Sequence, residues 1–385
     1  MTPSTAERYL RLGLRLGRHV EGIVDAYFGP PELRAAVDSE QLTEPRTLVA
    51  DAEALLDELD DGWLRDQVAG LRTYAGVLAG EPVSYADEVE RCYGVRPAYT
   101  DDAVFAAAHE RLEVLLPGDG PPAERYERWR DSIRVPGDRI ERVVEAVIEE
   151  ARARTRGLVE LPEGEGITLE IVRDRPWLAF NYYLGDLQSR IAVNVDLPIS
   201  ALDLLQLAIH ETYPGHHAER CCKEQLLVRD RGLLEETIVL VPAPQSLVSE
   251  GIAELAPDVL LEGEGGAAFA GALREEAGVE LDLDHALAVE RAHEPCRRAD
   301  VNAALMLHAD GAREAEAQAH LERWALMSAE RSAHMIRFMT EPTSRTYVIT
   351  YSAGRELCRS FVAGDPRRFR RLLTEQVRVR DLLER

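Results

Sequence analysis

The chain has little positive charge and almost no lysine. Lys223 is its single lysine, and 45 lysine and arginine residues face 69 aspartate and glutamate residues, for a formal net charge of −24. Such acidity disfavours nucleic acids and anionic membranes as partners, because their phosphate groups would be repelled. It favours solubility and only weakly indicates a basic substrate.

Long apolar runs are also missing. No segment approaches the roughly 20 apolar residues of a membrane-spanning helix, so the sequence argues against a membrane protein. Met1 leads directly into a charged, amphipathic pattern, without the apolar stretch of a secretory signal. The five cysteines are an odd number and include no Cys-x-x-Cys pair. We therefore expect reduced thiols in a cytoplasmic protein.

Helical periodicity dominates the sequence, and repeats of 20–50 residues are absent. Apolar residues recur at three- and four-residue spacing between charged ones, which predicts amphipathic helices. We expect helices over residues 5–27, 45–58, 62–80, 101–115, 136–157, 281–309, 313–339, 343–362 and 366–383.

The pattern changes to strand-like alternation between residues 161 and 198. Strands are expected at 167–172, 178–183 and 190–195, with Gly185-Asp186 as a turn. They predict a small antiparallel sheet immediately before the histidine-rich segment. An edge strand of this sheet could pair with an extended peptide, and a sheet that only covers the core is the other interpretation.

The histidine-rich segment 210–217 reads His-Glu-Thr-Tyr-Pro-Gly-His-His and follows an almost wholly apolar run, 201–209. This pattern predicts a buried helix that carries imidazoles and a carboxylate into an interior site. Those side chains need a partner there, because buried polar groups are costly when unpaired. A metal ion is such a partner. Neutral imidazoles bind zinc, and a carboxylate that does not bind it takes a proton from the water on the ion.

The spacing differs from the common His-Glu-x-x-His helix, in which the histidines are at i and i+4. Here Pro214 occupies i+4, and Gly215 follows it. Proline removes a helix hydrogen bond and glycine permits unusual dihedral angles, so we predict a bulge that returns His216 to the face of His210. On an unbroken helix His217 would share that face, but about 10 Å further along the axis. We therefore prefer His216 as the second ligand and keep His217 as the alternative.

The same segment resembles the His-Glu-x-x-Pro-Gly-His-His signature of the bacterial domain-of-unknown-function family 885, whose members are thought to be metallopeptidase-like. Three further segments resemble that family, so the likeness covers nearly the whole chain: 24–30 (Val-Asp-Ala-Tyr-Phe-Gly-Pro), 249–251 (Ser-Glu-Gly) and 351–354 (Tyr-Ser-Ala-Gly). The resemblance implies a zincin-like metallohydrolase.

Glu250 is the candidate for the third ligand that a catalytic zinc needs. It lies in an apolar run, 246–253, and by that pattern alone an exposed position is favoured. The resemblance of its Ser-Glu-Gly segment implies instead that Glu250 binds the metal. Glu254, one helical turn further on, is the substitute ligand or a partner of a histidine ligand.

Three residues are candidates for catalysis. Glu211 follows a ligand directly and cannot easily share the metal, which suits a general base; a surface glutamate is the other interpretation. By its family-like segment, Tyr351 is a candidate donor to a developing oxyanion, with Tyr347 as the neighbouring alternative. A partial match to a family segment implies that His308 contacts substrate, although such a histidine is ordinarily structural. Arg297 and Arg298 are candidates to bind a carboxylate terminus of the substrate, but helix-surface charge pairing is favoured for both.

The sequence thus predicts a mainly α fold, a large helical zincin-like body with a small antiparallel sheet before the metal-site helix. Residues 1–160 are expected to form an N-terminal helical region, and 161–385 the catalytic region. The expected function is hydrolysis of an amide or peptide bond by zinc-activated water, with another divalent transition metal as an alternative. A hydrolase of a non-peptide small molecule and a metal-stabilised binding protein without turnover are the other hypotheses.

Overall fold

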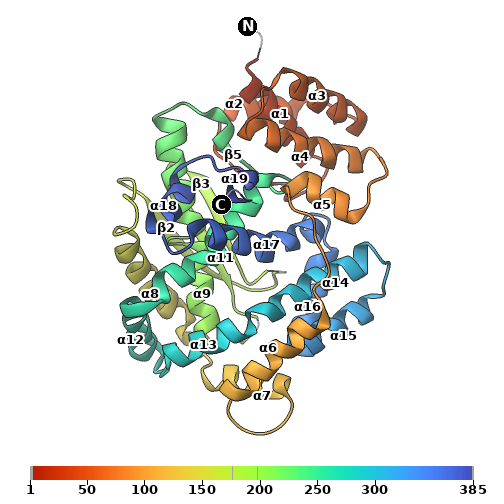
Figure 1. Cartoon of the computed structure of the whole chain (residues 1–385). Coiled ribbons are helices and arrows are strands. Elements are labelled where there is room, and N and C mark those ends of the chain that lie inside the picture. Colours follow the sequence, from red (N-terminus) through yellow and green to blue (C-terminus); the bar gives the residue numbers. More distant parts are fainter. Residues whose placement is uncertain (1–2, 176, 197, 384–385) are drawn as a thin grey trace.

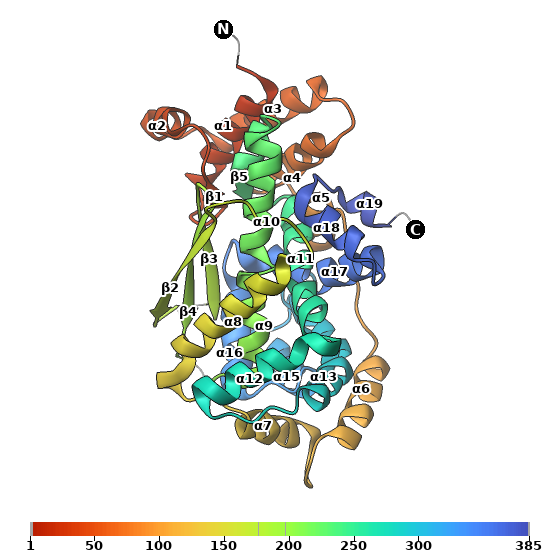
Figure 2. The same cartoon turned by 90° about the vertical axis from the view of Figure 1, so that its left-hand side faces the viewer.

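The structure is a computed structural model and describes residues 3–175, 177–196 and 198–383. Helices make up most of the molecule, and two small sheets accompany them (Figures 1 and 2). The first four helices gather at one end, whereas α7, α12 and α13 lie toward the other. The fold is therefore mainly α, as predicted.

The helices before the larger sheet are α1 (Thr5–Gly17), α2 (Pro31–Ser39), α3 (Pro45–Glu58), α4 (Trp63–Leu78), α5 (Tyr85–Tyr93), α6 (Asp102–Leu115), α7 (Pro122–Ser132) and α8 (Ile140–Thr155). Those after it are α9 (Ala201–Glu211), α10 (His216–Lys223), α11 (Pro244–Leu261), α12 (Gly266–Ala277), α13 (Leu283–His293), α14 (Ala299–His308), α15 (Glu314–Trp324), α16 (Ala329–Thr340), α17 (Ser344–Val362), α18 (Pro366–Thr374) and α19 (Val379–Leu383). Within the described residues, none of these helices combines the length and the apolar character that crossing a bilayer requires.

The helix predicted over 5–27 is shorter than expected. It begins with a capping box at Ser4 and ends at Gly17, and β1 (Val24–Tyr27) follows. The chain turns back between them, since Gly22 adopts φ +88° and a Cβ on Gly17 would lie 2.7 Å from Val24 Cγ2. Strand β1 pairs antiparallel with β5 (Ile238–Leu240).

Three other predicted helices are each divided in two. The one over 281–309 breaks at 294–298, where Pro295 cannot continue the α-helical hydrogen bonds. The one over 313–339 breaks between α15 and α16, where Leu326 adopts φ 55°. The one over 366–383 divides into α18 and α19. Periodicity located these helices but missed the turns within them.

The larger sheet contains the three predicted strands: β2 (Gly166–Val172), β3 (Ala179–Gly185) and β4 (Gln188–Asn194). Its order is β2-β4-β3. The β3–β4 pair is antiparallel, as predicted, but β2 pairs parallel with β4, so the sheet is mixed. Alternating apolar and polar residues predict a strand, but they do not show which strand it pairs with or in which direction. The prediction therefore missed the parallel pairing of β2.

Besides a small cluster of five buried residues around Cys221, the described part of the chain contains two large hydrophobic cores. The smaller combines the first four helices with Ile238, Leu240 and Ala243. The larger extends from Tyr85 to Leu382 and includes residues on both sides of position 160. The domain border at 160 stays a prediction, but the larger core crosses it and packs α8 against α9 and α12.

Candidate metal centre

Helix α9 carries His210 and Glu211 in its last turn. Ser200 caps its beginning by accepting a hydrogen bond from the backbone of Asp203, and the helix ends at Glu211. The chain then folds back so sharply that Gly215 approaches the end of α9. A Cβ on Gly215 would lie 1.9 Å from the carbonyl oxygen of His210. Only glycine fits there, and α10 begins at the next residue, His216. The break brings the two rings together, with centroids 4.8 Å apart.

Glu250 reaches the same place from α11. Helices α11 and α17 touch along their backbones, since a Cβ on Gly251 would lie 2.4 Å from the Gly354 carbonyl oxygen. A Cβ on Gly354 would in turn lie 2.4 Å from the carbonyl oxygen of Leu247. The Ser-Glu-Gly and Tyr-x-x-Gly segments are therefore packed on each other. This contact brings α17 close to the side of α11 that carries Glu250.

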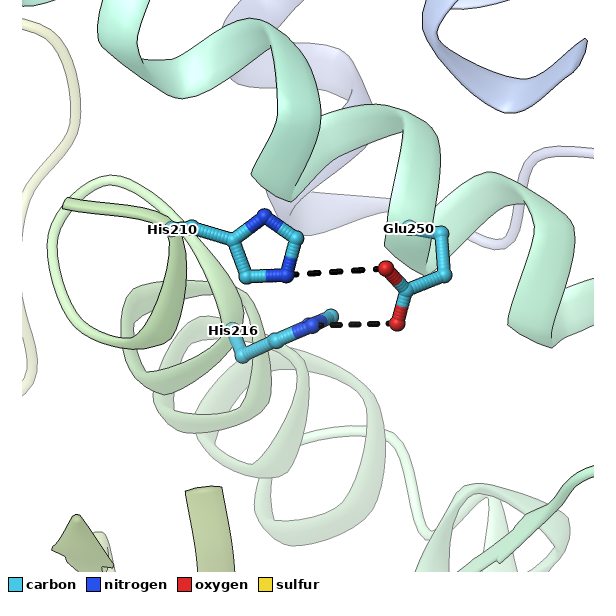
Figure 3. Close-up of side chains that lie close together, drawn as sticks. All are labelled: His210, His216 and Glu250. Atoms are coloured by element: carbon cyan, nitrogen blue, oxygen red, sulfur yellow. Dashed lines mark ion pairs between the residues drawn. The ribbon is translucent and has the colours of Figure 1, made fainter. Parts of the chain in front are cut away.

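His210, His216 and Glu250 form a compact cluster (Figure 3). The Nε2 atom of His210 lies 3.5 Å from one Glu250 oxygen, and the Nε2 atom of His216 lies 3.2 Å from the other. One ligand atom from each residue lies within 4.8 Å of those of the other two, and no other such trio is found in the described part of the chain. These are the three residues predicted from the sequence as metal ligands.

The donor set suits a zinc-type ion. Two atoms that bind one tetrahedral ion at about 2.0–2.2 Å are about 3.3–3.6 Å apart, close to the two separations between histidine nitrogens and Glu250 oxygens. The Oε2 atom of Glu250 is buried and makes no hydrogen bond among the described residues. A buried carboxylate oxygen without a hydrogen bond is costly, and a cation between it and the imidazoles would remove that cost.

Ser249 fixes the orientation of His216. Its hydroxyl donates to Glu219 Oε2 at 2.5 Å and accepts from Arg220 at 3.0 Å. The His216 Nδ1 atom lies 3.2 Å from the same oxygen. Because the single hydroxyl proton of Ser249 is directed at Glu219, its oxygen accepts a hydrogen bond from His216 Nδ1–H, and Nε2 is directed at Glu250. Such an outer contact commonly fixes the tautomer of a histidine ligand.

Glu254 contacts His210 from the other side. One of its oxygens lies 3.5 Å from His210 Nδ1, and the other accepts from Arg297. Burial opposes ionisation of Glu254, but Arg297 and His210 outweigh it and lower its pKa. The two carboxylates of α11 thus contact different nitrogens of one ring, so Glu254 is a partner of His210 and not a member of the cluster.

The charges of the cluster are mutually stabilising. Burial disfavours both ionised forms, but Glu250 raises the pKa of His216 to about 9. Against its own burial, the two histidines and a hydrogen bond from Tyr347 lower the pKa of Glu250. The Tyr347 hydroxyl donates to Glu250 Oε1 at 2.5 Å. The carboxylate is thereby held in its ionised form.

Glu211 lies beside the cluster without belonging to it. Its side chain is buried and lines the neighbouring cavity, and Asn181 of β3 donates to its backbone carbonyl at 2.8 Å. Burial raises the pKa of Glu211, although His210 and His216 pull it down. Its carboxyl group therefore has a higher proton affinity than an ordinary glutamate, as a general base that works near neutral pH requires.

A cavity of about 360 Å³ opens beside the cluster. His210, Glu211, Glu254 and Tyr351 line one part of it. Tyr351 thus faces the cavity, whereas its neighbour Tyr347, at a ring distance of 5.7 Å, donates to Glu250. Of the two candidate oxyanion donors, Tyr351 therefore lies in the cavity wall and Tyr347 is hydrogen-bonded to the cluster.

Two predicted site residues lie elsewhere. His217 is fully buried, with Nδ1 2.7 Å from Ser189 and Nε2 3.1 Å from Glu165, so neither ring nitrogen remains for a metal. The structure thereby corrects the alternative of His217 as a ligand. The Nε2 atom of His308 lies 3.0 Å from the Met339 carbonyl oxygen, and its ring packs on Tyr85. His308 does not line the cavity, which corrects its expected contact with substrate.

Asp25 of β1 is a neighbour of the cluster that the sequence pattern did not predict. Burial raises the pKa of Asp25, and Arg220, His216 and Glu250 all act on its charge, so it lies in the electrostatic neighbourhood of the cluster. The only signal was its place in the family-like segment 24–30. The contacts of Ser249 and Glu219 were not predicted either, because nothing in a single sequence shows which serine meets His216.

No family model and no curated protein sequence matches the chain. Its fold is similar to that of a “putative lipoprotein” from Colwellia psychrerythraea, with a TM-score of 0.57 and 15% identity over 91% of this chain and 64% of that one. It is also similar to a “putative lipoprotein of unknown function” from Shewanella oneidensis, with a TM-score of 0.51 and 12% identity over 99% and 73%. The chain therefore spans less than two thirds of the Colwellia protein. At these identities the likeness shows a shared fold alone, and the resemblance to family 885 stays a prediction.

Proposed function

We propose that the chain is a zinc-dependent hydrolase of amide or peptide bonds. The observation that carries the proposal is the largely buried cluster of two imidazoles and one carboxylate, one oxygen of which makes no hydrogen bond and lies 3.5 Å from His210 Nε2. A second carboxylate, Glu211, lies beside it in the cavity wall. A purely structural zinc site fills its positions with protein ligands and has no need of a base, so this combination favours catalysis.

In this proposal His210, His216 and Glu250 hold the ion, and Glu254 and Ser249 orient the two rings through their Nδ1 atoms. A bound zinc-type ion would supply a Lewis acid and a water molecule of lowered pKa. The Glu211 carboxylate accepts a proton from water and returns it to the leaving nitrogen. The Tyr351 hydroxyl donates to the oxyanion that develops on the substrate carbonyl.

The test compares metal-free and zinc-loaded protein on a panel of dipeptides, N-acyl amino acids and simple esters. We expect hydrolysis of at least one amide or peptide that disappears with a chelator and returns with zinc. Hydrolysis of esters alone would favour the non-peptide alternative. A chain that binds one ion tightly but turns over no member of the panel would instead be a metal-stabilised binding protein.

A further inference from the structure

Three arginines line the cavity, and two of them are neutralised by close carboxylates. Arg297 donates to Glu254. Arg355 donates to both oxygens of Asp258, at 3.0 Å each. Their charges are therefore committed to the protein, and neither offers an unshared charge to a ligand.

Arg331 of α16 is different. Its nearest paired carboxylate is Asp203, at 3.9 Å, and Arg130 holds that carboxylate in a much closer contact. Arg331 donates to the carbonyl oxygen of Pro198 at 3.0 Å, which carries no net charge. Burial and Arg130 lower the pKa of Arg331, against the attraction of Asp203 and Glu127. Two guanidinium groups thus share one carboxylate, and the more loosely held one lines the cavity.

The spacing of residues along α9 indicates how Arg331 lies relative to the His210–His216–Glu250 cluster. Asp203, Leu207 and His210 all line the cavity, and their spacing places them on one face of α9. A rise of 1.5 Å per residue separates Asp203 from His210 by about 10 Å along the helix axis. Arg331 is next to Asp203. The His210–His216–Glu250 cluster therefore lies toward one end of this face of α9, and the incompletely neutralised Arg331 lies toward the other.

The cavity wall also carries apolar side chains. Leu207 comes from α9, Met335 and Phe338 from α16, and Val348 from α17. A ligand that fits these walls has an apolar body, and the arginine calls for an anionic group on it. A guanidinium matches a carboxylate with two parallel hydrogen bonds.

We propose that Arg331 binds a carboxylate of the substrate, so that the enzyme acts on small peptides or amides with an apolar body and a free carboxylate. The inference rests on the proposed hydrolase function. An extended peptide advances about 3.3–3.6 Å per residue. Side chains of the protein at both ends of the cavity occupy part of the distance of about 10 Å along α9. The remainder accommodates one or two substrate residues between the scissile bond and the carboxylate.

The test uses N-benzoyl dipeptides with an apolar C-terminal residue and the same dipeptides as C-terminal carboxamides. Zinc-loaded wild-type protein is expected to prefer the carboxylates. Arg331→Met should lower kcat/KM for the carboxylates by about 10- to 100-fold, the usual loss for a charge-assisted hydrogen bond. It should leave the carboxamides nearly unchanged, which also reports that the variant is folded. Arg134→Met is the matched control, because Arg134 pairs with Asp131 and does not line the cavity.

A binding measurement separates this inference from the proposed function. Calorimetry with the same probes on Glu211→Gln protein needs no turnover. If nothing is hydrolysed, but the carboxylates bind more tightly than the carboxamides and Arg331→Met removes the difference, the carboxylate site stands and the hydrolase proposal fails. Equal binding or equal turnover of the two series by wild-type protein overturns the carboxylate site. If Arg331→Met does not fold, Arg331→Lys replaces it and should keep only part of the preference.

Discussion

The Nε2 atom of His216 lies 3.2 Å from the Oε1 atom of Glu250, although the two residues belong to different helices, α10 and α11. The Nδ1 atom of the same ring contacts Ser249, the neighbour of Glu250 in α11. Two successive residues of α11 thus contact both nitrogens of one imidazole. The ring is held before any ion binds, which lowers the conformational entropy lost on binding.

We expect the purified protein to hold about one zinc-type ion per chain and the His210→Ala, His216→Ala double variant to hold none. The two imidazoles are neutral ligands that alanine cannot replace. Elemental analysis of protein prepared without chelator measures the content. His308→Ala is the control and should keep its metal, because that ring contacts the Met339 carbonyl instead. Stoichiometric metal in the double variant would mean that the ion binds elsewhere.

Glu250→Ala should weaken metal binding more than Glu254→Ala does. The first change removes a ligand, whereas the second removes a contact to His210 Nδ1, which typically costs about 10- to 100-fold in affinity. Competition with a chromogenic chelator gives both affinities. The reverse order would identify Glu254 as the ligand.

Ser249→Ala should also lower metal affinity by about 10- to 100-fold, because His216 loses the acceptor that directs its Nε2 atom. Ser246→Ala is a close control on the same helix. Ser246 is buried as well, but its hydroxyl donates to the Leu240 carbonyl oxygen and not to the cluster. Equal losses in the two variants would show that the effect comes from a general disturbance of α11.

The sequence predicted that His210 and His216 lie together because the cause is a local pattern. Pro214 and Gly215 predicted the break that brings His216 to His210, and the close approach of Gly215 to the His210 carbonyl shows why that break needs glycine. The choice between neighbouring histidines has an equally local reason. Adjacent helical residues point about 100° apart, so His217 faces Glu165 when His216 faces Glu250.

The rest of the site depends on contacts between distant segments, which a single sequence does not show. By pattern alone Glu250 was more typical of an exposed residue, and only its family-like segment implied a ligand. The helix predicted over 5–27 includes Asp25, but in the structure that helix ends at Gly17 and Asp25 lies in β1. Arg331 received no role at all, because its loose pairing becomes visible only when α16 packs beside Asp203.

Glu165→Gln should destabilise the protein at pH 7 by about 1–3 kcal/mol, and the difference should shrink in acid. Burial opposes ionisation of Glu165, but hydrogen bonds from His217, Tyr213 and Arg152 lower its pKa to about 2. A carboxyl group with a depressed pKa stabilises the fold above its unfolded value of about 4.3, and this contribution is lost as the pH falls toward 2.

Urea denaturation of wild-type and variant protein at pH 7 and pH 3 measures this effect. Glu163→Gln serves as the control, since Glu163 is exposed in the same turn and should change stability little at either pH. A difference between wild type and Glu165→Gln that stays constant with pH would show that the carboxylate charge is not what stabilises this network.

Glu211→Gln should abolish most hydrolysis and leave the metal in place. The amide keeps the shape of the side chain but cannot accept a proton at neutral pH, and general acid–base groups contribute about 10²–10⁴-fold to rate. Metal content should stay near that of wild type, because the cluster residues His210, His216 and Glu250 are unchanged. Turnover and metal stoichiometry are measured on one preparation, with a substrate from the panel. Full activity in the variant would remove Glu211 from the mechanism, and loss of the metal would make it a ligand. Loss of activity with retained metal distinguishes a base from a ligand and an enzyme from a metal-stabilised binding protein.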